Sequence, residues 1–170
     1  MTTKAPVKVI FDTDPGVDDA MALYYALAHP GIDVVGITTT FGNVTALQAA
    51  TNALYLSAIA GQPTIAVTRG VAAPMVLQSE AKFDFIHGAD GLGNLPSRVA
   101  TSNQLDPRTS AQFIVDMARA QPGEITLVAV GPLGNVALPT HRLNLLLLVA
   151  RLKALTWMWL KLLLQKLALK

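Results

Sequence analysis

The sequence predicts an α/β fold with an open, mostly parallel sheet flanked by helices. Through the first 140 residues, short apolar runs of strand length alternate with longer segments of helical periodicity, as in consecutive strand–helix–strand units. The chain has 170 residues, of which 52% are hydrophobic and 14% charged, so it can form one domain with a substantial core. Both observations favour a layered globular domain over a disordered chain.

The first half contains five expected elements. The run VKVIF at 7–11 is a first strand, and the segment 18–28 spaces its apolar residues for a helix that opens with acids, where the helix dipole favours them. The β-branched residues at 32–40 predict a second strand. A helix at 45–61 would end at a glycine, and TIAV at 64–67 predicts a short third strand.

The second half begins with a long segment, 68–108, that has no strong periodicity. A loop of this length is uncommon in a compact domain unless it has a task, such as covering a site. The segment 110–121 predicts a helix, and EITLVAV at 124–130 predicts a fourth strand that enters the turn GPLGN. We expect another helix to begin near Asn135.

The last thirty residues differ in composition from the rest. Residues 141–170 contain six Lys and Arg and no acid, whereas residues 1–140 contain seven basic and eleven acidic residues, a net charge of −4. We therefore divide the chain into a partial α/β domain at 1–140 and a Leu/Lys-rich, divergent helical tail at 141–170. The pI near 9.0 reflects this tail and does not predict nucleic-acid binding.

Composition also limits the cofactors and the location. The chain has no cysteine, which excludes a disulfide scaffold and a thiolate zinc site. Its first residues lack the apolar core of a signal peptide, so a cytoplasmic location is expected. No eighteen uninterrupted apolar residues occur, so no membrane span is expected, although binding of the tail to a membrane surface stays open.

Four aspartates, Asp12, Asp14, Asp18 and Asp19, lie within eight residues at the end of the first predicted strand. Crowded carboxylates repel one another and lose hydration, so they require a cation or hydrogen-bond donors. Asp14 and Asp19 are spaced to reach one ion across a Pro-Gly turn, and oxygen ligands favour Ca²⁺ or Mg²⁺. Asp12 is expected to bond turn amides. For Asp18, a helix N-cap role stays open.

Two more polar loops should meet this acidic loop. The first follows the second strand and contains Asn43, and the second is VGP after the fourth strand. Because ligands bind at the carboxyl ends of parallel strands, the three loops would face one crevice. Taken alone, Asn43 is better explained as a turn residue, and His87, beside Phe85 and Ile86, as a structural histidine.

Four motifs occur in order: DTDPGVDDAMAL, GITTTFGNV, IHGADGLGN and LVAVGPLGNVAL. With them, residues 7–138 resemble the amino-terminal half of the inosine-uridine-preferring nucleoside hydrolases. The resemblance implies the Rossmann-like nucleoside hydrolase fold, here truncated. It also implies hydrolysis of the N-glycosidic bond of ribonucleosides to ribose and free base around one Ca²⁺. A ribonucleoside is then the expected partner, and a homo-oligomer is compatible with the family.

The resemblance also assigns roles to particular residues. Asp14 would ligate Ca²⁺ and act as general base toward water, Asp19 would be a second ligand, and Val130 would offer its backbone carbonyl. The residues that would contact substrate are Asp18 and Asn43, at the ribose, and His87, on a loop near the base.

The chain departs from this family after residue 140. The family's second half supplies a further calcium ligand and ribose-binding residues, whereas residues 141–170 read as a divergent or frameshifted terminus. We therefore expect very low activity for this chain. An inactive pseudoenzyme or interaction module remains an alternative. So does a haloacid-dehalogenase-type phosphatase, which also begins with a strand and Asp-x-Asp but has no use for the second pair of aspartates.

Overall fold

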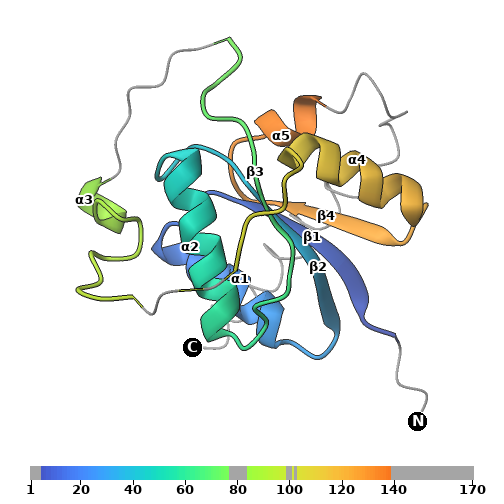
Figure 1. Ribbon diagram of the computed structural model, residues 1–170, viewed down its shortest axis with the longest axis horizontal. Helices are drawn as coiled ribbons and strands as arrows, with labels where there is room; N and C mark the ends of the chain where they lie inside the picture. Colours follow the sequence, from blue (N-terminus) through green and yellow to red (C-terminus); the bar gives the residue numbers. More distant parts are fainter. Residues whose placement is uncertain (1–4, 77–83, 99–100, 102, 139–170) are drawn as a thin grey trace, which may run out of the picture.

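The computed structural model describes residues 5–76, 84–98, 101 and 103–138, and in this part of the chain four parallel strands form one sheet. The strand order is β3-β2-β1-β4, and every pairing is parallel, which confirms the predicted fold class (Figure 1). The strands are β1 (Val7–Thr13), β2 (Ile32–Thr39), β3 (Val67–Arg69) and β4 (Ile125–Ala129).

Helices cover both faces of the sheet (Figure 1). They are α1 (Val17–Ala28), α2 (Ala46–Ile59), α3 (Asp84–His87), α4 (Ser110–Ala120) and α5 (Gly134–Ala137). Two of them begin at threonine N-caps, because the Thr45 side chain accepts a hydrogen bond from the Gln48 amide and Thr109 does the same for Gln112. The predicted helix starts, including the one near Asn135, are confirmed to within one residue.

The side chains of β1 alternate between two cores. Val9 and Phe11 pack into a cluster with residues of α1 and α2, while Ile10 packs on the opposite face with Phe113 and Ile114 of α4. Successive strand residues point to opposite faces, so a sheet covered on both sides needs this continuous apolar run. The run VKVIF is therefore the sequence signal of a central strand.

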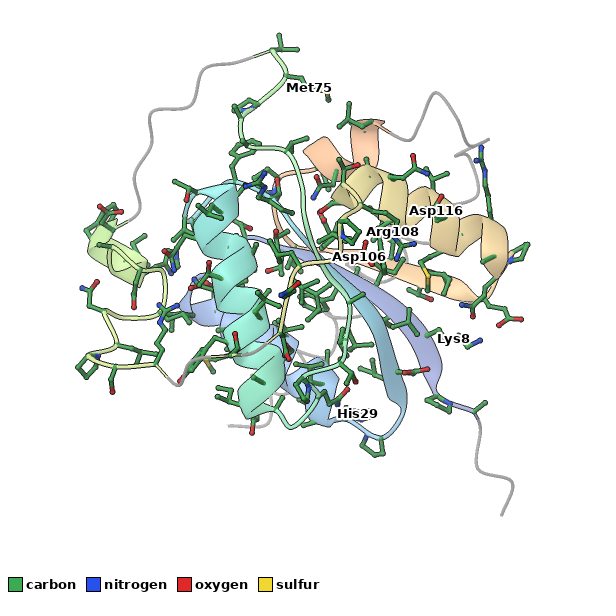
Figure 2. The ribbon with its side chains drawn as sticks, in the orientation of Figure 1. Lys8, His29, Met75, Asp106, Arg108 and Asp116 are labelled. Carbon is green, nitrogen blue, oxygen red and sulfur yellow. The ribbon has the colours of Figure 1, made fainter. Side chains whose placement is uncertain are left out.

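The helix α4 approaches the sheet closely over a glycine of β2. A Cβ atom at Gly36 would lie 2.4 Å from the ring of Phe113, so no larger residue fits there without movement. Arg108 contacts the same ring, with its guanidinium carbon 4.6 Å from the ring centroid. Arg108 also pairs with Asp106 at 2.6 Å and Asp116 at 3.5 Å, and the three side chains gather beside α4 in Figure 2.

The second and fourth strands differ from the prediction by one residue at one or both ends, and the third and first strands differ by more. The third strand is Val67–Arg69 instead of 64–67, because these three residues align with Ile37–Thr39 of β2. Buried Thr68 shares a hydrogen bond of 2.9 Å with Ser110, a partnership that an apolar pattern does not indicate. The first strand runs on to Thr13, so Asp12 lies inside the strand and pairs with Thr38.

The predicted tail at 141–170 lies outside the described residues, and so does the boundary proposed at residue 140. Within the described residues, every helix is too short or too polar to cross a membrane.

Candidate functional site

Three loops meet at the carboxyl ends of the strands, around the side chain of Asp14. The backbone N–H of Asn43, after β2, donates a hydrogen bond of 2.6 Å to Asp14 Oδ2. From the turn after β4, a Cβ atom at Gly131 would lie only 2.5 Å from Asp14 Oδ1. Because Val130 N–H also bonds Asp12 O at 2.9 Å, the Val130–Gly131 peptide runs beside the acidic loop. The sequence predicts this convergence from parallel strands alone.

Asn43 joins the two carboxylates that the sequence assigns to a cation. Its side-chain Nδ2 donates a hydrogen bond of 2.7 Å to Asp19 Oδ2, while its backbone holds Asp14. The Gly16 N–H also donates to Asp19 Oδ2, at 3.2 Å. The exposed fraction is only 4% for Asp14 and 7% for Asp19. Two acidic side chains are thus buried together and share one polar neighbour.

The protonation of these carboxylates is strongly perturbed. Burial raises the pKa of Asp14 to about 7, the charges of Asp19 and Asp12 add to the rise, and the hydrogen bond from Asn43 opposes it. Burial also raises the pKa of Asp19, and the negative charge of Asp18 adds to this rise. A carboxyl group with a pKa near neutrality can accept a proton under physiological conditions, which is the property required of a general base.

Glycine is required beside Asp14. Gly42 has a φ of +154°, and a Cβ atom there would lie 1.9 Å from Asp14 Oδ2. Gly131 lies close to the other carboxylate oxygen, so the Asp14 carboxylate lies between two glycines, where no side chain takes up space. Both carboxylate oxygens are therefore held close to the main chain.

His87 and Asn43 approach the acidic loop over Gly16. A Cβ atom at Gly16 would lie 2.7 Å from Asn43 Nδ2 and 2.9 Å from His87 Nδ1. The His87 ring is buried, and its Nδ1 accepts a hydrogen bond of 3.3 Å from Val17 N–H. Asp18 Oδ1 lies 3.8 Å from the same nitrogen, but 83% of the Asp18 side chain is exposed. Gly16 is the N-cap of α1, so the N-cap alternative for Asp18 is wrong.

Asp12 does not bond the turn amides, contrary to the expectation from the sequence. Its Oδ1 accepts hydrogen bonds from the Thr38 hydroxyl at 2.5 Å and from Asn135 Nδ2 at 2.8 Å. The reason is that β1 includes Asp12, whose side chain therefore points from the strand toward α5 and not into the turn. Burial raises its pKa to about 6 against these two hydrogen bonds.

Comparison with known proteins places these motifs in a family. A family model described as inosine-uridine preferring nucleoside hydrolase matches residues 9–158. The chain belongs to this family. That membership favours the leading expectation over the phosphatase alternative.

Among relatives of this nucleoside hydrolase chain, a probable uridine nucleosidase 2 from Oryza sativa subsp. japonica is 46% identical over 131 residues, covering 77% of this chain and 39% of the relative. The inosine-uridine preferring nucleoside hydrolase of Leishmania major is 36% identical over 134 residues, covering 78% and 42%. The chain thus spans about two fifths of the length of these curated relatives.

Solved structures agree on the fold. A plant nucleoside hydrolase superimposes with a TM-score of 0.76 at 41% identity, covering 82% of this chain and 44% of that one. A purine-preferring ribonucleoside hydrolase from Gardnerella vaginalis gives a TM-score of 0.75 at 31% identity, covering 79% and 43%. The sheet and its flanking helices therefore have the arrangement of nucleoside hydrolases.

The donor atoms in the acidic loop suit a hard cation. Asp14 and Asp19 are buried, mutually repelling carboxylates, and the carbonyl of Val130 belongs to a peptide that runs beside Asp14. These are oxygen donors, which Ca²⁺ and Mg²⁺ prefer. Within the described residues, three or more His, Cys, Asp or Glu side chains do not come together in one metal-binding group. A cation here would thus depend on two carboxylates together with backbone, water or other oxygens.

Two buried asparagines were missed as site residues. Asn52 of α2 and Asn135 of α5 are both fully buried, and each bonds to loops at the strand ends. In the sequence, Asn52 stands close to Ala49, Ala50 and Ala53 in a mostly apolar helix, and a polar residue at such a position is the signal that could have identified it. Asn135 carries the weaker signal of an asparagine directly after a strand-to-helix turn.

Proposed function

We propose that this chain forms the acidic part of a ribonucleoside hydrolase site, at which water cleaves the N-glycosidic bond to give ribose and a free base. The observation that carries the proposal is that Asn43 donates hydrogen bonds to both Asp14 and Asp19, at 2.6 and 2.7 Å. Family membership supports the reaction class. Ca²⁺ is the proposed cation, with Asp14, Asp19 and the carbonyl of Val130 as ligands.

Asp14 is the proposed general base. As the bond from water to the anomeric carbon forms and the C–N bond breaks, the water proton passes to Asp14. The electron pair of the C–N bond stays with the departing base, which takes up a proton from solvent, and Asp14 then releases its own proton to solvent. Burial raises the pKa of Asp14 to about 7 in the metal-free chain, and the charge of a bound Ca²⁺ would lower it, so Asp14 would be ionised and able to accept a proton near neutral pH. Ca²⁺, when bound, would supply positive charge that orients and acidifies the attacking water.

Three further residues are proposed to contact the nucleoside. The exposed carboxylate of Asp18, in the first turn of α1, is available to accept a hydrogen bond from a ribose hydroxyl. Asn43 would contact the sugar or the water, and His87 would lie near the base. Negative charge beside the ribose would stabilise an oxocarbenium-like transition state.

Ligand number limits what these residues can do alone. Ca²⁺ takes roughly six to eight oxygen ligands, more than Asp14, Asp19 and one carbonyl supply. The proposal therefore includes water or other protein oxygens in the set. We also propose a cytoplasmic location, which cell fractionation would test. Assembly of more than one copy of the chain is proposed as well, and light scattering would test it.

The direct experiment measures ribose release. The purified full chain is incubated with inosine or uridine, with Ca²⁺ or with a chelator. We expect Ca²⁺-dependent release that Asp14→Asn abolishes and that Asp33→Asn leaves unchanged, because exposed Asp33 lies near the opposite end of β2. Release that is independent of Ca²⁺, or unchanged by Asp14→Asn, would refute the assignment. Ca²⁺ binding without ribose release would favour the alternative of an inactive pseudoenzyme or interaction module.

A further inference from the structure

The side chain of Asn52 connects two loops that are far apart in the sequence. Its Nδ2 donates hydrogen bonds to Pro15 O in the acidic loop, at 3.1 Å, and to Asp90 O in the segment 84–98, at 2.9 Å. Its Oδ1 accepts from Arg98 Nη1 at 2.5 Å and from Gln48 Nε2 at 2.9 Å. An amide side chain has two donor hydrogens and two acceptor lone pairs, so all of its capacity is used.

Asp90 and Arg98 hold the segment 84–98 together by contacts within the segment. The carboxylate of Asp90 pairs with Arg98 Nη2 at 2.6 Å and accepts backbone hydrogen bonds from Leu92, Asn94 and Leu95. The guanidinium of Arg98 also lies over the ring of Tyr55 on α2, 5.6 Å from its centroid. These contacts fix the segment both internally and to the helix that carries Asn52.

Glycine allows this close approach. A Cβ atom at Gly91 would lie 2.7 Å from the Val44 side chain, 2.9 Å from Pro15 O and 3.0 Å from Asn52 Nδ2. The φ of Gly91 is +80°, a conformation that glycine adopts without strain. The segment 84–98 is therefore packed directly against both the acidic loop and α2.

His87 is held by this packed segment. Gly93 N–H donates a hydrogen bond of 2.8 Å to His87 O, and Val17 N–H, at the start of α1, donates to His87 Nδ1 at 3.3 Å. A nitrogen that accepts a hydrogen bond carries no proton. The neutral ring consequently has its proton on Nε2.

We propose that Asn52, together with Asp90 and Arg98, is a positioning residue that holds His87 against the start of α1 with its proton on Nε2. His87 then offers a hydrogen-bond donor, not an acceptor, to an oxygen or nitrogen of the bound nucleoside. This role toward substrate rests on the proposed function. The positioning itself is a property of the chain without substrate.

A purely structural role for Asn52 would not need these particular partners. Ala49, Ala53 and Leu56, which lie near Asn52 on α2, are buried and apolar, so an apolar residue would pack at this position without the cost of burying an amide. The two Nδ2 hydrogens instead go to backbone carbonyls of the two loops that carry the proposed site residues. The pattern of contacts therefore points to positioning of His87.

The test reads the tautomer of His87 directly. On the ¹⁵N-labelled full chain at about pH 8, above the ordinary pKa of histidine, a long-range ¹H–¹⁵N correlation identifies the protonated ring nitrogen. The signal of His87 is the one missing in His87→Gln. We expect the proton on Nε2 in the wild type. In Asn52→Asp, whose carboxylate repels Pro15 O and Asp90 O, we expect mixed tautomers. Amide exchange at Gly91 and Gly93 should be about tenfold faster.

Two variants keep the result interpretable. Ser57→Ala removes another hydrogen bond of α2, from the buried Ser57 Oγ to Leu54 O, and makes no change in the segment 84–98. It should leave the tautomer and the exchange rates unchanged. Arg98→Gln breaks the ion pair with Asp90. If Asn52→Asp does not fold, this variant tests whether the contacts of the segment 84–98 set the tautomer of His87. We expect it to change both readouts in the same direction as Asn52→Asp.

Several outcomes would overturn the proposal. They are a wild-type proton on Nδ1, an unchanged tautomer in folded variants, or an equal effect of Ser57→Ala. Because nucleoside and Ca²⁺ are absent from these measurements, their result does not depend on ribose release. A chain with no hydrolase activity but the expected tautomer pattern would refute only the proposed function.

Discussion

Asn135 donates a hydrogen bond of 2.8 Å to Asp12 Oδ1, which joins α5, the helix that follows β4, to the end of β1. The same amide donates to Thr39 O at 2.8 Å, and its Oδ1 accepts from Val71 N–H at 3.0 Å. Thr39 ends β2, and Val71 follows β3 by two residues. One fully buried side chain therefore ties together the carboxyl ends of all strands of the described sheet.

We expect Asn135→Ala to destabilise the fold. The change leaves Thr39 O and Val71 N–H without this partner, and a buried group left unpaired costs about 1–3 kcal/mol. Urea unfolding followed by circular dichroism should thus give a free energy of unfolding lower by at least about 2 kcal/mol. Gln112→Ala, which removes an exposed hydrogen bond to Asp116, should change it by less than about 0.5 kcal/mol. An equal loss of unfolding free energy in Asn135→Ala and Gln112→Ala would contradict the role of Asn135 in joining the strand ends.

Most strands and helices were predictable because their signals are local, whereas the short helix α3 lies in the segment 68–108, where no helix was predicted. Val9, Ile10 and Phe11 form a continuous apolar run, and Thr45 and Thr109 directly precede helical periodicity. The strand ends were less predictable, because they consist of buried polar residues. Thr13 and Thr68, for example, are fully buried and belong to strands, although their polarity suggests a loop.

A close contact between β2 and α4 gives a second stability prediction. Gly36→Ala places a methyl group 2.4 Å from the Phe113 ring, and overpacking of this kind costs about 1–3 kcal/mol. Thermal unfolding should therefore occur at a lower temperature in Gly36→Ala. Adding Phe113→Leu should recover part of the loss, because the smaller side chain makes room for the methyl group. Losses that simply add in the double variant would exclude this steric cause.

The candidate site was predictable only in part, for a related reason. Asp14 and Asp19 could be found because their charges are concentrated in one short loop. Asn52 and Asn135 could not, because their partners are distant: Asn52 lies 37 residues from Pro15, and Asn135 lies 123 residues from Asp12. Such roles depend on the tertiary fold, and no spacing within one motif encodes them.

Asp90 predicts an acid-sensitive contribution to stability. Partial burial would raise its pKa, but hydrogen bonds from Leu92 and Asn94 and the pairing with Arg98 outweigh this and lower the pKa from 3.8 to about 2. The folded chain then binds fewer protons here than the unfolded chain between about pH 4 and pH 2. The contribution of Asp90 is therefore complete above that range and is lost as the pH falls through it.

The measurement compares the wild type with Asp90→Asn by denaturant unfolding across this pH range. Groups with raised pKa values, such as Asp12 and Asp14, change stability with pH in the opposite direction, but they are present in both chains. The stability difference between the two chains therefore reports Asp90 alone. We expect the stability difference to shrink as the pH falls below about 4. A difference that stays constant down to pH 2 would show that Asp90 does not act through its charge.

The glycine beside Asp14 gives the most direct test of the proposed cation site. In Gly42→Ala, the new methyl group would lie 1.9 Å from Asp14 Oδ2, so the carboxylate must move away from the position that Asn43 gives it. Calorimetric titration with Ca²⁺ should show affinity lowered by about 10- to 100-fold, as when a group that orients a metal ligand is lost. Gly61→Ala is the matched control, since Gly61 has a φ of +75° and nothing within 4 Å of its would-be Cβ. It should lose about 1–2 kcal/mol of stability and keep the Ca²⁺ affinity of the wild type. If both variants bind Ca²⁺ like the wild type, Asp14 is not a ligand.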